Sequence, residues 1–217
     1  MRRLNLLLSF LLIFSMSSLA STQILTFKHS LELEDAAGDI REDNDDIGKD
    51  VIKVTINSDG KNLHITAVLK ENISYYLEKC KAGPVITLHF DTDNDTTTGG
   101  KTVWGKKLGF EYEVGLMACI KYKDGGIACV GSVGAPIEGY ASSFRTKKYK
   151  QGEKFPETIR WSTNAPHRDI KENVVETTFP YTEIAVTSEK SVRIAIREDD
   201  STFDEKSFFP EVVLTLK

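Results

Sequence analysis

Alternation of apolar and polar side chains is the sequence feature that most constrains the fold of this chain. Between Val51 and Lys70, two alternating runs flank the turn residues Ser58–Lys61. The Asp-Gly pair in that turn is typical of a tight β-hairpin. A period of two places alternate side chains on opposite faces of a strand. The segment therefore predicts an antiparallel hairpin with one face on a core and His64 on the other face.

Further short runs of this kind recur along the chain, and Gly, Pro, Asn and Asp separate them. The segment 71–83 predicts at most a helical turn, and no long amphipathic helix pattern is present. Many short strands with frequent turn signals predict an all-β fold, an antiparallel β-sandwich of the jelly-roll type. The basic stretch 142–154 is expected to be a mobile surface loop. The other expected strands are 85–91, 110–122, 127–133, 158–162, 174–179, 191–197 and 212–216.

Residues 1–20 have the pattern of a signal peptide. Arg2 and Arg3 precede an apolar run from Leu4 to Phe14, and Ser-Leu-Ala ends the segment at Ala20. This run is too short to span a membrane, which takes about 20 residues. We therefore expect a secreted or periplasmic protein with no membrane span and a single β-sandwich domain over residues 21–217.

The charge balance of the expected mature chain is acidic. It has 26 basic and 32 acidic residues, since the leader contains two arginines and no acids. Nucleic acids and anionic membranes attract proteins with an excess of positive charge. A nucleic-acid partner is therefore not expected.

Three cysteines bear on the fold: Cys80, Cys119 and Cys129. An exported protein meets oxidising conditions, which permit a disulfide. A three-residue hairpin loop at Lys123–Gly125 places Cys119 opposite Cys129, whereas a two-residue loop shifts the register by one and separates them. The sequence leaves both registers open. Cys80 is then the leftover thiol, most simply a small buried residue.

An acidic stretch from Asp91 to Gly100 lies between two expected strands. Asp91, Asp93 and Asp95 are spaced two residues apart, and a Gly pair follows them. Convergent carboxylate oxygens are the ligands that Ca²⁺ prefers. The helix-loop-helix calcium motif fails here, because its turn glycine and its final glutamate are missing and the flanks are strands. We therefore expect Glu111 or Glu113 of the next strand to complete the site.

Two alternatives to metal binding stay open in the acidic segments. The stretch 91–100 could be an Asx-rich turn in which carboxylates accept hydrogen bonds from their own backbone. The region from Asp35 to Asp50 is also rich in Asp and Glu. It is either a solvated acidic loop or the site of a second cation.

Catalytic and haem-binding interpretations rest on fewer residues. Glu111 and Glu113 share one face of a strand, as paired carboxylates do in jelly-roll glycoside hydrolases. Met117, His64 and His89 are the candidates for haem axial ligands in the strand region. Each residue also has a simpler role in the core or on the surface.

Aromatic side chains provide candidates for carbohydrate binding. A flat aromatic ring packs well on the C–H face of a sugar. Trp104 and Trp161 could supply such a platform, together with Tyr112 and Tyr140. Each of these side chains could equally well belong to the core.

Four short motifs occur in order: Asp35–Asp39, Asp50–Val54 with Asp59-Gly60 and Leu63, Leu88–Asp95 with Thr98-Gly99 and Gly109–Glu113, and Val175–Pro180 with Ile184. Together they resemble the β-sandwich of family 9 carbohydrate-binding modules and the wider DOMON-like group. The resemblance implies a jelly roll with structural Ca²⁺ held by Asp91, Asp93, Asp95 and Glu111. It further implies a face that binds sugar or, in other branches, haem. We therefore expect a non-catalytic carbohydrate-binding protein, with a haem-carrying electron-transfer module and a glycoside hydrolase as alternatives.

Overall fold

The computed structural model describes ten segments of the chain. The expected leader 1–20 and Trp104 lie outside them, as does most of the acidic region 36–48. The side chains of Trp161 and Cys80 are also outside the described set. The described segments are 24–35, 42–43, 46–47, 49–80, 82–100, 109–129, 136–152, 157–161, 168–198 and 209–217.

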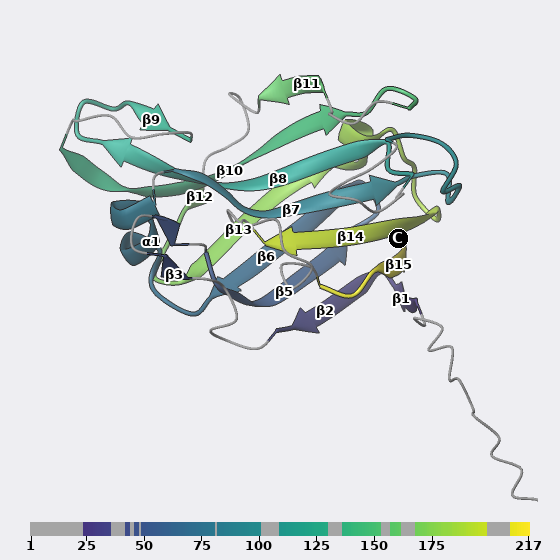
Figure 1. Cartoon of the computed structure of the whole chain (residues 1–217), viewed down its shortest axis with the longest axis horizontal. Coiled ribbons are helices and arrows are strands. Elements are labelled where there is room, and N and C mark those ends of the chain that lie inside the picture. Colours follow the sequence, from purple (N-terminus) through teal and green to yellow (C-terminus); the bar gives the residue numbers. More distant parts are fainter. Residues whose placement is uncertain are drawn as a thin grey trace, which may run out of the picture.

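Two β-sheets make up the described part of the fold (Figure 1). Sheet A has the order β1 (Leu25–Lys28), β15 (Val212–Thr215), β14 (Ser191–Glu198), β7 (Gly83–Asp91), β8 (Tyr112–Tyr122), β10 (Ile137–Lys148) and β11 (Glu157–Trp161). In addition, β9 (Ile127–Ala128) pairs with β8, and β12 (Arg168–Asp169) pairs with β10. Sheet B has the order β13 (Val174–Pro180), β6 (Asn62–Leu69), β5 (Val51–Ser58) and β2 (Ser30–Glu34). Strands β3 (Glu42–Asp43) and β4 (Asp46–Ile47) form a separate two-stranded sheet.

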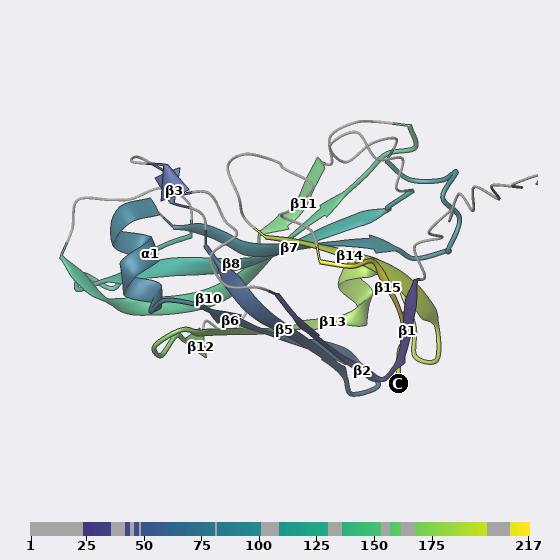
Figure 2. The ribbon, with the colours of Figure 1, turned by 60° about the horizontal axis from the view of Figure 1, so that its bottom comes forward.

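The sheets stack as two layers with the core between them (Figure 2). Fully buried side chains of sheet B, such as Ile56 and Ile65, belong to the same apolar cluster as Leu88 and Phe90 of sheet A. The pairs are antiparallel except for β1 on β15, which is parallel. This confirms the predicted all-β sandwich. The jelly-roll connection pattern stays a prediction.

The hairpin predicted from Val51 to Lys70 is confirmed. Strands β5 and β6 pair antiparallel around Asp59-Gly60, and Leu63 and Ile65 face the core. Gly60 has a φ of 99°, a conformation that a side chain disfavours. His64 lies on the opposite face of the strand and is partly exposed. The predicted helical turn after β6 is the short helix α1 (Ile73–Cys80), and η1 (Tyr181–Ile184) is a single 3₁₀ turn.

The basic stretch 142–154 is where the loop prediction was wrong. Residues 142–148 belong to strand β10, which pairs with β8 along its length. Phe144 packs in the core, while Arg145 and Lys147 point to the outer face of sheet A, the face turned away from sheet B. Lys147 forms an ion pair with the buried Glu113 of β8, its direct cross-strand neighbour. The basic residues are therefore compatible with a strand because a carboxylate of the neighbouring strand compensates their charge.

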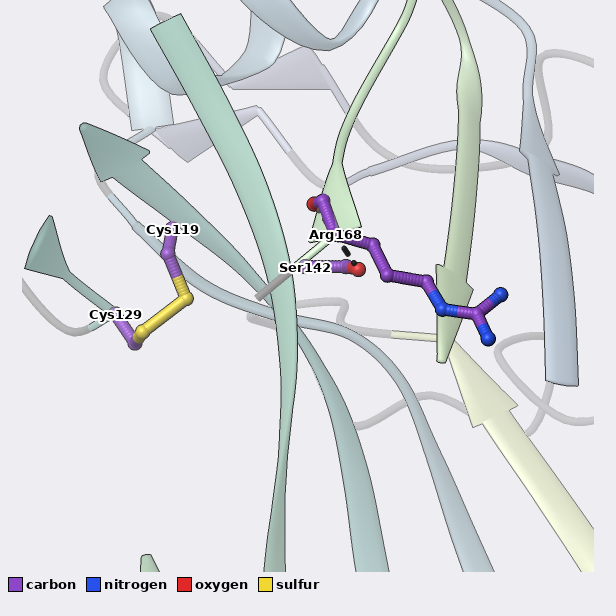
Figure 3. Close-up of a disulfide and its surroundings, with 4 residues drawn as sticks. All are labelled: Cys119, Cys129, Ser142 and Arg168. Atoms are coloured by element: carbon purple, nitrogen blue, oxygen red, sulfur yellow. Dashed lines mark hydrogen bonds between the residues drawn. A yellow bond between two sulfur atoms is a disulfide. The ribbon is translucent and has the colours of Figure 1, made fainter. Parts of the chain in front are cut away.

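Of the two registers that the sequence left open, the structure has the one with a disulfide between Cys119 and Cys129 (Figure 3). Strand β9 pairs with β8 through Lys121–Ile127 and Ile120–Ala128, so the next pair in register is Cys119 with Cys129. The loop register is the three-residue one, and Gly125 has a φ of 84°. Cys119 is fully buried, so the bond fastens a short edge hairpin to the sheet.

Among the described residues, no helix has the length and hydropathy of a membrane span.

Candidate metal centre

Three carboxylates meet where β7 ends and β8 begins, at the opposite end of the sandwich from α1 (Figure 1). Asp91 is the last residue of β7, and Glu111 directly precedes β8. The Glu111 amide donates to the Phe90 carbonyl at 3.0 Å, which holds the two segments side by side. One oxygen from each of Asp91, Asp93 and Glu111 lies within 4.8 Å of the others. The structure thus brings together three of the four predicted metal ligands.

Asp91 is fully buried and has an unusual hydrogen-bond arrangement. Its Oδ2 accepts hydrogen bonds from Nε and Nη2 of Arg193, at 2.9 and 2.8 Å. Its Oδ1 is buried and accepts no hydrogen bond of ordinary geometry from the described residues. Burial raises the pKa of Asp91, and Arg193 only partly opposes this shift. A buried acceptor without a hydrogen-bond donor costs free energy. A cation next to Asp91 Oδ1 would remove that cost.

Glu111 is the second fixed ligand candidate. Its Oε2 accepts a hydrogen bond from the Thr92 amide at 2.7 Å, and its Oε1 accepts one from the Thr98 hydroxyl at 2.9 Å. Burial raises its pKa, and the charges of Asp93 and Asp91 raise it further. The carboxylate is therefore held in one orientation by the loop, while its negative charge is disfavoured. A divalent cation between these groups would remove that penalty.

Asp93 and Asp95 differ in their roles. Both are exposed, and Asp93 Oδ1 accepts a hydrogen bond from the Asp95 amide at 2.9 Å. Asp95 Oδ1 accepts hydrogen bonds from the amide and the hydroxyl of Thr97, at 2.9 and 2.7 Å, and these bonds lower its pKa. The Asp95 carboxylate lies outside the three-carboxylate group. The Asx-turn alternative thus describes Asp95 well, whereas it leaves the buried Oδ1 of Asp91 unexplained.

Glycine is required where the loop returns to the sheet. Gly99 has a φ of 62°, and a Cβ atom there would collide with the Phe110 carbonyl and lie 2.7 Å from Glu111 Oε1. Gly109 has a φ of 57°, and its Cβ would lie 2.5 Å from the Thr96 Cα. The absence of side chains at both positions lets the acidic loop pack directly on Glu111.

The donor set fits a hard divalent cation. Three carboxylates supply oxygen, one from a buried strand end and two from adjacent segments, and no nitrogen or sulfur ligand belongs to this group. Ca²⁺ takes six to eight oxygen ligands, so backbone carbonyls or water would complete the shell. The same oxygens suit other hard cations such as Mg²⁺. The geometry therefore supports a metal centre of this class.

A second polar group lies next to this site on the outer face of sheet A. His89, Glu113 and Lys147 are successive cross-strand neighbours on β7, β8 and β10. Glu113 Oε1 lies 2.6 Å from Lys147 Nζ, and Glu113 Oε2 accepts a hydrogen bond from the Tyr149 hydroxyl at 3.2 Å. Burial lowers the pKa of His89 to about 4, so the imidazole is neutral at physiological pH. His89 stacks on Phe110, with ring centroids 5.6 Å apart.

This arrangement bears on the catalytic alternative. Glu111 and Glu113 share the outer face, as predicted, but they have separate partners. Burial alone would raise the pKa of Glu113, but the neighbouring His89 and Lys147 outweigh that effect and lower it. A glycosidase needs one carboxyl group that stays protonated near neutral pH to act as a general acid. Glu113 is held ionised and the pKa of Glu111 is raised, so the pKa shifts do not decide against a carboxylate pair. Both Glu111 oxygens already accept hydrogen bonds from Thr92 and Thr98 of the acidic loop, and the catalytic alternative stays a prediction.

The remaining predicted ligand residues are dispersed. His89 and Met117 lie on the outer face of sheet A and are buried, whereas His64 lies on sheet B. Tyr112 is buried against the core, and Trp161 belongs to β11.

Sequence reasoning missed Arg193, which lies 102 residues from Asp91. Alternation within β14 indicates which face of the strand carries Arg193, but it does not indicate that Asp91 is the cross-strand neighbour.

The comparisons add no further assignment: no protein-family model, no curated protein and no solved structure matches the chain.

Proposed function

We propose that this chain is an exported binding module whose β-sandwich is stabilised by a non-catalytic Ca²⁺ and whose ligand is carbohydrate. The observation that supports the metal is the buried Asp91 Oδ1 beside Asp93 and Glu111, an acceptor that meets no donor at ordinary hydrogen-bond geometry among the described residues. A cation there would neutralise carboxylates that are otherwise poorly tolerated.

The carbohydrate part of the proposal is supported by the sequence resemblance and by the tryptophans of the chain, since sugars are bound by planar rings together with fixed polar groups. Phe110, Glu113 and Tyr149 on the outer face of sheet A are buried and do not supply such a platform. Trp104 and Trp161 are the predicted stacking residues. Secretion or delivery to the periplasm rests on the leader pattern of residues 1–20.

Two measurements test this proposal separately. Calorimetric titration with CaCl₂ should give saturable binding to the wild-type protein, and Asp93→Asn should weaken it strongly. Binding of the labelled protein to an array of glycans should give signals that Trp104→Ala or Trp161→Ala removes. Calcium binding without any glycan signal would leave the metal site in place and reject the carbohydrate ligand. An absorption band of haem in the purified protein would favour the electron-transfer alternative.

A further inference from the structure

A second group of interacting polar side chains lies on the outer face of sheet B. Thr178 of β13 and His64 of β6 are direct cross-strand partners. Asp59 lies in the turn between β5 and β6, and Arg168 belongs to β12. The contacts connect these four residues in series: Asp59 Oδ2 to His64 Nε2 at 2.7 Å, His64 Nδ1 to Thr178 Oγ1 at 3.0 Å, and Arg168 Nη2 to Thr178 Oγ1 at 3.1 Å.

The tautomer of His64 sets the direction of its hydrogen bonds. Arg168 can only donate, so Thr178 Oγ1 accepts from it. With the neutral imidazole protonated on Nε2, toward the carboxylate of Asp59, the Thr178 hydroxyl donates to Nδ1. His64 Nδ1 is then the unprotonated nitrogen, and Nε2 donates its proton to Asp59. The hydrogen bond from His64, together with the amides of Lys61 and Asn62, lowers the pKa of Asp59, so its carboxylate is ionised. The imidazole is thus held in the tautomer that can accept the hydroxyl proton.

We propose that Thr178 is a nucleophilic hydroxyl that takes an acyl group from small activated esters, with His64 as its general base. A hydroxyl bonded to an imidazole, which a carboxylate orients in turn, is the arrangement that activates serine and threonine nucleophiles. The catalytic residues are Thr178 and His64. Asp59 is a positioning residue, because it acts through the imidazole.

The chemistry balances without any further cofactor. Thr178 Oγ1 attacks the carbonyl carbon of the ester, and His64 Nδ1 takes the hydroxyl proton. The tetrahedral intermediate expels the alkoxide or phenoxide, which leaves with that proton as the free alcohol. Water then attacks the acyl-threonine, again with His64 as base, and releases the carboxylic acid and Thr178. The net reaction is ester plus water giving acid plus alcohol.

Arg168 is placed to stabilise the negative charge that develops on the carbonyl oxygen. Its backbone is anchored by pairing of β12 with β10, and the Ser142 hydroxyl donates to the Arg168 carbonyl at 3.4 Å (Figure 3). Its side chain extends away from this anchor (Figure 3), and Nη2 donates to Thr178 Oγ1. A guanidinium beside the reacting oxygen has several N–H donors that a tetrahedral intermediate can use. Asp59, His64 and Arg168 are all open to solvent, so small esters can reach Thr178.

This site is independent of the proposed metal centre. His64 and Thr178 belong to sheet B, Asp59 to the turn between β5 and β6, and Arg168 to β12, which pairs with β10. Asp91 is the last residue of β7, and Glu111 directly precedes β8. Chelation of Ca²⁺ should therefore leave the acyl transfer unchanged as long as the protein stays folded. Loss of Ca²⁺ binding can therefore be distinguished from loss of acyl transfer.

The test uses 4-nitrophenyl acetate and the whole protein. We expect release of nitrophenolate above the buffer rate, and an acetyl group on the peptide that contains Thr178. Thr178→Val keeps the shape of the side chain and should abolish both signals, while Thr178→Ser should retain them. His64→Gln should lower the rate by about 100-fold, the lower end of a general-base contribution. Thr66→Val, on the same face of β6, is the matched control and should behave like the wild type.

Two results would overturn the proposal. One is acetylation and nitrophenolate release that are the same in Thr178→Val and the wild type. The other is a folded Thr178→Ser protein, verified by its melting temperature, that shows neither signal. Both outcomes would mean that Asp59, His64, Thr178 and Arg168 form a structural network that only connects the strands.

Discussion

Replacing Asp93 by asparagine should change the stability of the protein in opposite directions with and without Ca²⁺. Asp93 raises the pKa of Glu111 through its charge, so it repels the carboxylate beside it. Asp93→Asn removes this repulsion and keeps an oxygen that can accept the Asp95 amide. In excess chelator, the variant should therefore be at least as stable as the wild type. In Ca²⁺ it should be less stable, because one anionic ligand is lost.

The expected size of the effect follows from the geometry and from mass action. The three carboxylate oxygens lie within 4.8 Å of one another. Two unit charges at that separation repel by about 3.5 kcal/mol at an effective dielectric constant of about 20. Ca²⁺ at about 100 times its dissociation constant stabilises the native state by about 2.7 kcal/mol. For a chain of this length, that corresponds to a rise in melting temperature of about 5–10 °C. Asp93→Asn should show less than about a third of this rise at the same Ca²⁺ concentration.

Differential scanning fluorimetry in a Ca²⁺ titration, with chelator as the reference, measures both effects. Asp95→Asn is the matched control, because Asp95 belongs to the same loop but lies outside the three-carboxylate group. It should retain most of the Ca²⁺-dependent rise. If wild-type protein melts at the same temperature in Ca²⁺ and in chelator, the three carboxylates hold no metal and the reasoning fails. If Asp95→Asn loses the rise as fully as Asp93→Asn, Asp95 is a ligand as the sequence predicted.

Three further predictions concern the fold around these sites. Arg193→Met leaves Asp91 buried without its partner and should cost about 3–5 kcal/mol in chelator, and Ca²⁺ should restore part of this loss in urea denaturation. His89 has a pKa of about 4, below its ordinary 6.5. Its contribution to stability is therefore complete above pH 6.5 and falls by about 3 kcal/mol toward pH 4, and the difference between wild type and His89→Gln should follow that window. Replacing Cys119 and Cys129 together by alanine should lower the free energy of unfolding by about 3 kcal/mol, because the bond closes a ten-residue loop.

Much of the strand pattern could be predicted because it depends on neighbouring residues. The hairpin of β5 and β6 was visible from alternation and from Asp59-Gly60, and both are confirmed by the pairing. The Cys119–Cys129 bridge followed from the length of one short loop, once the three-residue register was chosen.

Strand β10 was missed because Arg145 and Lys147 made the segment look solvated. A basic strand is stable only if the neighbouring strand supplies a compensating charge, and Glu113 lies 34 residues earlier in the chain. Local composition does not report which strand will be adjacent. The same limit applies to His89, which lies on the outer face of sheet A and is nevertheless completely buried.

The sequence by itself determined the all-β fold, the turn between β5 and β6, and the cluster of acids after β7, since each depends on spacing within a few residues. Only the tertiary structure decided which acids converge. Asp91 and Glu111 meet because β7 and β8 pair, and Arg193 reaches Asp91 because β14 lies on the other side of β7. Asp95 is closer in sequence to Asp91 than Glu111 is, but its carboxylate turns to its own loop. Strand pairing fixes such distances, and it depends on the whole core and not on any one segment.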